Sequence, residues 1–75
     1  MPFPRERYDA ETLDLMSEAL DAAWEEAEYA LASESFDPAE VRRLMSIRIM
    51  AAVRDGEHDP ALLKELALDE IARVY

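Results

Sequence analysis

Two short segments, DPAE at residues 37–40 and DPA at residues 59–61, determine where helices can begin in this chain. Aspartate is a preferred N-cap residue because its carboxylate accepts a hydrogen bond from an N–H of the first turn, and proline suits the first helical position. In the first segment Glu40 follows the cap by three residues, which is the spacing of a capping box. Gly56 lies just before the second start and suits the left-handed residue that ends a helix. These signals divide the chain into helices joined by short connections.

Apolar residues recur at helical spacing between these signals, and Ala, Leu, Glu and Arg dominate the composition. We therefore predict helices over roughly 10–32, 38–55 and 60–73. Short connections place sequential helices antiparallel. The sequence thus predicts an all-α fold, a small antiparallel three-helix bundle over residues 9–75, preceded by a flexible N-terminal arm at residues 1–8.

A chain of 75 residues without cysteine has few means of stabilising itself. A domain of this size buries only about 60% of the surface that its unfolded chain exposes, and it cannot form a disulfide. Small domains of this kind often gain burial by oligomerising. The length and composition therefore favour self-association.

The middle predicted helix has apolar residues around most of its girth. Ile49 belongs to its main apolar face, whereas Ile47 and Met50 point nearly the opposite way. On the first helix, Leu15, Ala22 and Tyr29 recur every seven residues away from the main apolar stripe. We predict a contact surface, covered in a homodimer, made of Leu15, Tyr29, Ile47 and Met50. The alternative is that these are scattered exposed apolar side chains, which are common.

The net charge is −10, and the negative charge is concentrated in the first predicted helix. Five carboxylates there step by four, three, four and three residues and so share one face: Asp14, Glu18, Asp21, Glu25 and Glu28. This acidic face is either a solvated surface, a docking surface for a basic protein, or a mimic of a phosphate backbone. An acidic surface repels nucleic acid, so direct binding to nucleic acid is disfavoured.

Arg48 stands between two isoleucines in an otherwise apolar stretch. If the first two helices are antiparallel about a turn near residue 35, Arg48 lies level with Asp21. We therefore predict a structural ion pair between Arg48 and Asp21, with the arginine methylenes over the core. The alternative is an anion site built from Arg43, Arg48 and Arg54.

No residue pattern in the sequence indicates catalysis, a metal or a cofactor. His58 is the only histidine, and the acidic residues around it lack the spacing of a calcium-binding loop. A single histidine without cysteine provides no zinc site, and no motif surrounds any of the serines. We therefore expect no catalytic residue, no metal ligand and no cofactor, and we predict that the protein is not an enzyme.

The longest uninterrupted apolar run, residues 49–53, is far shorter than the roughly 20 residues of a membrane span. The first residues contain two prolines and no apolar stretch, which is unlike a signal peptide. We therefore predict a cytoplasmic protein that does not contact a membrane.

The segment ETLDLMSEALDAAW, followed by an arginine-containing helix and DGEHDPALLKELAL, resembles a group of short all-helical bacterial proteins of unassigned function. The resemblance covers nearly the whole chain and implies a long first helix, a second helix, a capped turn and a final helix. It implies no catalytic residue.

Together these observations predict a small interaction or regulatory protein that acts as a homodimer and offers its acidic face to a basic partner. The alternative is a regulator linked to nucleic acid. Such a regulator would be either a helix-turn-helix relative that uses the arginines of the second helix, or an acidic mimic that blocks a DNA-binding protein.

Overall fold

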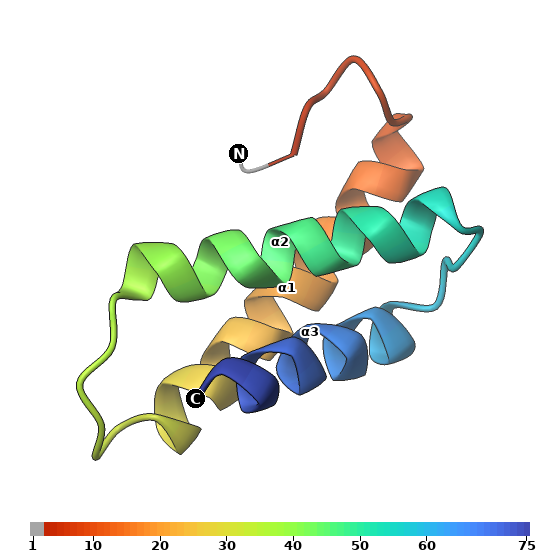
Figure 1. The fold of residues 1–75 in the computed structure, drawn as a ribbon. Helices are drawn as coiled ribbons and strands as arrows, with labels where there is room; N and C mark the ends of the chain where they lie inside the picture. Colours follow the sequence, from red (N-terminus) through yellow and green to blue (C-terminus); the bar gives the residue numbers. More distant parts are fainter. Residues whose placement is uncertain (1–2) are drawn as a thin grey trace.

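The computed structural model describes residues 3–75, which form three α-helices: α1 (Ala10–Ala30), α2 (Pro38–Arg54) and α3 (Pro60–Val74). All three helix pairs are in contact, and the described residues contain no strand, so the protein is an all-α three-helix bundle (Figure 1). The predicted helix bounds agree with the observed ones to within two residues. The largest difference is at the end of α1, where the chain leaves the helix after Ala30.

Each helix begins at an aspartate, which the sequence predicts for α2 and α3. The carboxylate of Asp9 accepts a hydrogen bond from the Thr12 N–H at 2.8 Å. Asp37 and Asp59 each accept one at 3.0 Å from the N–H two residues ahead. Gly56 has a φ of 100°, which L-residues with a side chain rarely adopt, and so it ends α2 as predicted. These local contacts explain why the helices begin and end where they do.

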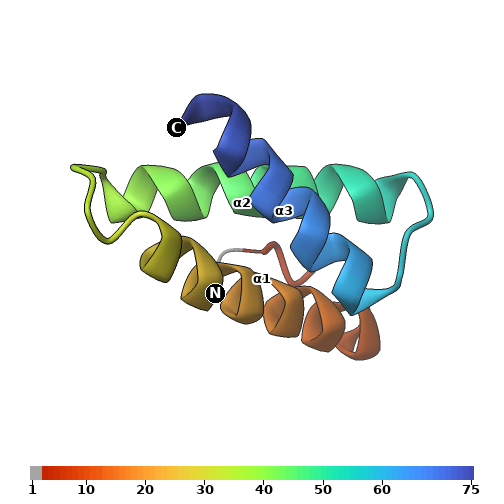
Figure 2. The same ribbon diagram turned by 90° about the horizontal axis from the view of Figure 1, so that it is seen from below.

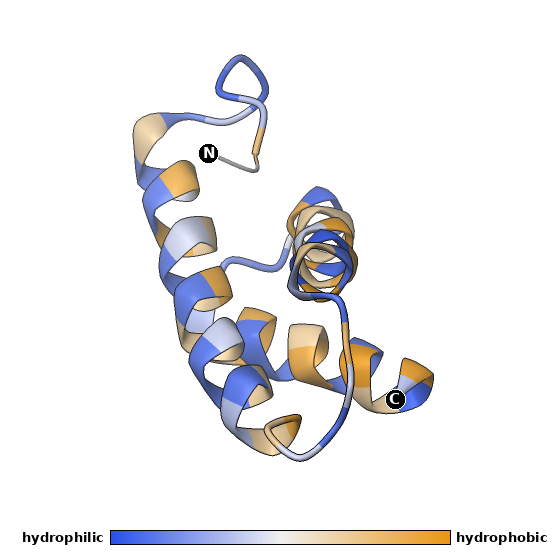
Figure 3. Cartoon of the chain, turned by 90° about the vertical axis from the view of Figure 1, so that its left-hand side faces the viewer, coloured by the Kyte–Doolittle hydropathy of each residue, from blue (hydrophilic) through white to orange (hydrophobic). Residues whose placement is uncertain are grey.

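The helices cross one another obliquely. When α2 is viewed almost end-on, α1 runs down the picture instead of lying beside α2 along its length (Figure 3). In the view from below, α3 also runs diagonally across α2 (Figure 2). The chain reverses direction at each connection. Because α1 and α2 cross, however, their residues do not remain opposite one another over several turns.

The core is formed by the inward faces of all three helices. Its fully buried side chains are aliphatic or thioether groups, the largest being Met16, Leu20, Val41, Met45, Ile49 and Leu63. Burial of such side chains is the main favourable contribution to the folding of a domain this small. Among the described residues, no helix combines the length and apolar character needed to cross a membrane.

The N-terminal segment differs from the predicted loose arm. Phe3 is only 2% exposed and belongs to the core, and Tyr8 packs partly buried against it. Figures 2 and 3 show this segment lying between α1 and α2. Because the two helices diverge there, an aromatic side chain fills space that they leave open. Of the predicted arm, residues 1 and 2 lie outside the described residues, and residues 3–8 are docked on the bundle.

Candidate functional site

The outward strip of α2 consists of Arg43, Ile47, Met50 and Arg54. These residues step by four, three and four, so they share the face opposite the buried Ile49. Ile47 is 47% exposed, whereas Ile49 on the same helix has no exposed surface. The strip therefore presents an exposed isoleucine and a partly buried methionine between two exposed arginines.

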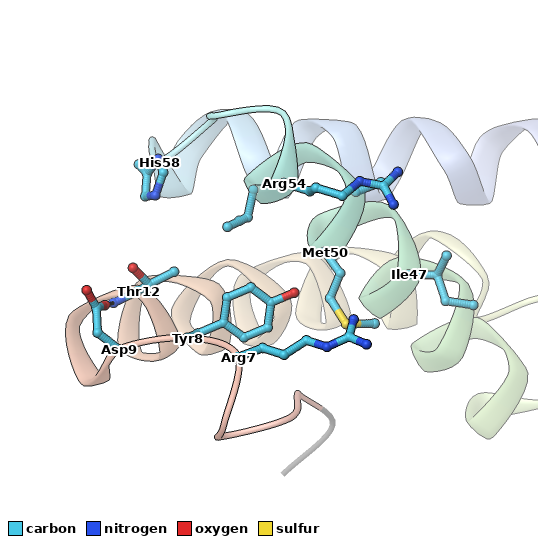
Figure 4. Close-up of a pocket in the computed structure, with 10 residues that line it drawn as sticks. Arg7, Tyr8, Asp9, Thr12, Ile47, Met50, Arg54 and His58 are labelled. Carbon is cyan, nitrogen blue, oxygen red and sulfur yellow. Dashed lines mark hydrogen bonds between the residues drawn. The ribbon is translucent and has the colours of Figure 1, made fainter.

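A hollow of about 660 Å³ lies beside this strip, between the N-terminal segment, the start of α1 and the second half of α2. Ile47, Met50 and the Tyr8 ring contribute its apolar lining, and Arg7 and Arg54 contribute two guanidinium groups. In Figure 4 both arginine side chains run in the same direction, one on each side of Met50. The hollow combines an apolar floor with positive charge, in a protein whose net charge is negative.

A second hollow of about 430 Å³ lies on the other side of the strip, towards the start of α2. Ile47 and Met50 line it too, together with Arg42 and Arg43. Because both hollows share Ile47 and Met50, these two side chains form a ridge with open space on each side. A partner could contact this ridge without displacing any described segment of the chain.

The inner end of the larger hollow is formed by Asp9, Thr12 and His58. Hydrogen bonding by Thr12, through its side chain and its backbone N–H, lowers the pKa of Asp9, and the nearby His58 lowers it further. The Nδ1 of His58 lies 3.0 Å from the Gly56 carbonyl oxygen, so the tautomer protonated at Nδ1 donates a hydrogen bond there. Both groups thus have a structural role at a helix start or a turn.

The arginines of α2 have different surroundings. Arg42 lies with its guanidinium carbon 5.2 Å from the centroid of the Trp24 ring. Trp24 in turn meets Phe36 edge-to-face, with 6.4 Å between ring centroids. Arg43 forms an ion pair with Glu40 at 2.6 Å, which raises the pKa of Arg43 and lowers that of Glu40 through hydrogen bonding. Glu40 therefore binds an arginine in this structure, although its spacing suggested a capping box.

The predicted ion pair between Arg48 and Asp21 is not formed. Within residues 3–75 the ion pairs are Glu40–Arg43 and Glu26–Lys64. Arg48 lines a small hollow with Asp55, Glu57 and Leu66, at the side of α2 that faces α3. The prediction was wrong because it assumed that α1 and α2 lie side by side, whereas they cross. The alternative anion site is not formed either, because the spacing along α2 puts Arg48 on a different face from Arg43 and Arg54.

The four residues of the predicted contact surface do not form one patch. Ile47 and Met50 are together on the strip. Leu15 packs partly buried against the core, and Tyr29 is 87% exposed. Ala22, on the same edge of α1, lines a hollow with the start of α3. The edge of α1 that carries Leu15, Ala22 and Tyr29, here called the α1 edge, thus faces the α3 side of the bundle, away from the strip. Of the four predicted residues, only Ile47 and Met50 are contiguous.

The acidic face of α1 is exposed along its whole length, as the spacing predicts: Asp14, Glu18, Asp21, Glu25 and Glu28 all reach solvent. Glu26, next to this row, pairs instead with Lys64 of α3, and hydrogen bonding and attraction by the carboxylate raise the pKa of Lys64. Lys64 therefore links α1 to α3 and leaves the acidic face itself without an ion-pair partner in the described part of the chain.

Metal ligands and buried hydroxyl groups are the remaining candidates for reactive groups. Over residues 3–75, no three His, Cys, Asp or Glu side chains converge as metal ligands would. The Oγ of Ser17 is buried and has no hydrogen-bond partner among the described residues. Ser17 precedes Trp24 by seven residues, so its helical position could have indicated this burial.

No protein-family model, curated protein or solved structure matches this chain.

Proposed function

We propose that this protein is a non-enzymatic, cytoplasmic interaction or regulatory protein that forms a homodimer through the outward strip of α2. The observation that carries the proposal is the exposed Ile47 side chain beside a partly buried Met50, on a helix whose other face already completes the core. A small domain without disulfides gains stability when such side chains are covered by a second copy. An interface with so few apolar side chains gives weak, concentration-dependent association.

The acidic face of α1 serves as a second surface, which is available to a basic partner protein. Five exposed carboxylates in regular spacing attract a positively charged surface over long distances and orient it. Dimerisation through α2 leaves this face uncovered, because the strip and the acidic row are on different helices.

The proposal is tested by the solution mass over a range of concentrations, measured by light scattering. The wild-type mass should rise towards that of a dimer, whereas Met50→Asp should remain a monomer, because a carboxylate on the ridge would be desolvated by contact. Circular dichroism should show unchanged helix content. The control is Tyr29→Asp, which introduces the same carboxylate at a more exposed position of α1, away from the strip, and should leave the mass unchanged.

A monomeric wild-type protein at every concentration would contradict the homodimer. A Met50→Asp variant that still dimerises would remove the strip from the interface. If Tyr29→Asp also produced monomers, the interface would include the α1 edge.

A second candidate function is that of an acidic mimic, which blocks a DNA-binding protein. The regular exposed row on α1 favours it, since phosphates also occur at regular intervals. A direct DNA binder is less well supported, because Arg42 is stacked on Trp24 and Arg43 is paired with Glu40. Titration with duplex DNA at several salt concentrations separates the two: a DNA binder shows a steep salt dependence, and a mimic does not bind DNA.

A further inference from the structure

Met50 differs from the other methionines that the structure describes in its access to solvent. Met16 and Met45 have no exposed surface. Met50 is partly buried against the core, and it lines the open hollows on both sides of the ridge. Its thioether is therefore accessible to small molecules dissolved in water, whereas the two core thioethers become accessible only when the bundle opens.

The larger hollow also provides polar surroundings for a modified Met50 side chain. Figure 4 shows this side chain extending from α2 towards the N-terminal segment, with Arg7 and Arg54 on its two sides. A sulfoxide oxygen at this position can accept a hydrogen bond from water or from either guanidinium group. Neither arginine has an ion-pair partner among residues 3–75, so both have N–H donors to offer.

The core offers no such surroundings to the other two sulfur atoms. The fully buried side chains around them are apolar. A sulfoxide oxygen at Met16 or Met45 would be a buried polar group without a hydrogen-bond partner, which is destabilising. Access to the sulfur and tolerance of the product thus select the same methionine.

We propose that Met50 is a methionine oxidation site, where hydrogen peroxide converts the thioether to a sulfoxide while the bundle remains folded. A lone pair of the sulfur attacks one oxygen of hydrogen peroxide, so that an S–O bond forms and the O–O bond breaks. The hydroxide that leaves takes the proton from the transferred oxygen and becomes water. The sulfur thereby loses two electrons, and the peroxide is reduced.

Oxidation changes the chemistry of the outward strip. It makes the end of the Met50 side chain polar without changing the net charge, so Ile47 remains as the apolar side chain of the ridge. In the proposed homodimer the sulfoxide would lose water on contact, and the association should therefore weaken. The oxidation site itself does not depend on the homodimer, because Met50 is accessible in a single chain.

The test is the rate of oxygen uptake at each methionine in the folded protein, treated with hydrogen peroxide at a dilution where it is monomeric. Trypsin cleaves after Arg48, so Met45 and Met50 are in separate peptides, and Met16 is in a third. Mass spectrometry should show Met50 oxidised at least about tenfold faster than Met16 and Met45. In concentrated urea the three rates should become equal.

Equal rates in the folded protein would overturn the oxidation site, as would a slower rate at Met50. Circular dichroism should show unchanged helix content once Met50 is oxidised. A loss of helix at that stage would overturn the tolerance of the sulfoxide by the folded bundle.

The matched control is Met50→Leu, which keeps a similar apolar volume and has no sulfur. After peroxide treatment this variant should associate as before, whereas the wild-type protein should associate more weakly. Equal weakening of both proteins would overturn the effect of Met50 oxidation on association. A wild-type protein that is monomeric with and without peroxide would contradict the homodimer alone, since the peptide rates decide the oxidation site independently.

Discussion

The outward face of α1 carries five carboxylates and no apolar side chain between them, whereas the outward strip of α2 carries two apolar side chains between two arginines. Both faces follow the same helical spacing, and both are turned away from the core. The acidic face repels a second copy of itself and is suited to a partner of opposite charge. The apolar surface of the strip lowers its free energy when a partner covers it and removes it from water. The position of a helix face away from the core thus says little about what binds it, and the distribution of charge and apolar surface says more.

The largest predicted effect is the difference in stability loss between substitutions on the buried face of α2 and on its outward strip. Ile49→Ala removes side-chain atoms from a fully buried position and should lower the free energy of unfolding by about 2–5 kcal/mol. Ile47→Ala makes the same change at a position that is 47% exposed, and it should alter that free energy by less than about 0.5 kcal/mol. Urea unfolding followed by circular dichroism, at concentrations where the protein is monomeric, measures both.

If Ile49→Ala does not fold, Ile49→Val supplies a smaller loss of about 0.5–1.5 kcal/mol for the same comparison. Equal losses at the two positions would mean that Ile47 contributes to the core of the monomer. The strip would then not be free to bind a second copy.

An intermediate effect concerns Asp9, the N-cap residue of α1, whose carboxylate accepts a hydrogen bond from the Thr12 N–H. Because Thr12 holds the pKa of Asp9 below its ordinary value of 3.8, the ionised side chain stabilises the folded state. This contribution is fully present above the pKa of the unfolded chain and is lost as the pH falls through the lower folded pKa. Asp9→Ala should lower the melting temperature at pH 7 by roughly a few degrees.

Asp9→Asn is the informative control, because asparagine caps helices about as well but does not titrate over this range. It should match the wild type at pH 7 and lose less stability than the wild type between about pH 4 and pH 2. Identical acid profiles for Asp9→Asn and the wild type would show that the acid transition arises elsewhere.

The helices could be predicted from the sequence because their signals are local. Each cap acts within three residues, and the left-handed Gly56 ends α2 without help from another element. The exposure of the acidic face likewise follows from spacing along one helix. These features depend on neighbours in the sequence, which a single chain displays directly.

The features that could not be predicted depend on how the helices cross. The position of Arg48 beside Leu66 of α3, and not beside Asp21 of α1, follows from how the helices pack, which leaves no trace in local spacing. The same crossing opens the space that Phe3 fills. It also separates the α1 edge from the strip, so that two apolar patterns that looked alike in the sequence are on different sides of the bundle.

The smallest predicted effect is the change in stability on Asp21→Asn. Its sign distinguishes the observed acidic face, without ion pairs, from the Arg48–Asp21 pair expected from the sequence. Asp21 has Glu18 three residues before it and Glu25 four residues after it, and no ion-pair partner among residues 3–75. Asp21→Asn removes two repulsive contacts, each worth about 0.2–0.5 kcal/mol, and should therefore stabilise the protein slightly. An Arg48–Asp21 pair would make the same substitution destabilising.

Asp69→Asn is a suitable control, because Asp69 has Glu65 four residues before it and Arg73 four residues after it. The repulsion by Glu65 and the attraction by Arg73 oppose each other. The gain from Asp21→Asn should disappear near about 1 M salt, where charges on the surface are screened over a few ångströms. Thermal unfolding at low and high salt tests both points, and a loss of stability in Asp21→Asn would favour an ion pair of Asp21 such as that with Arg48.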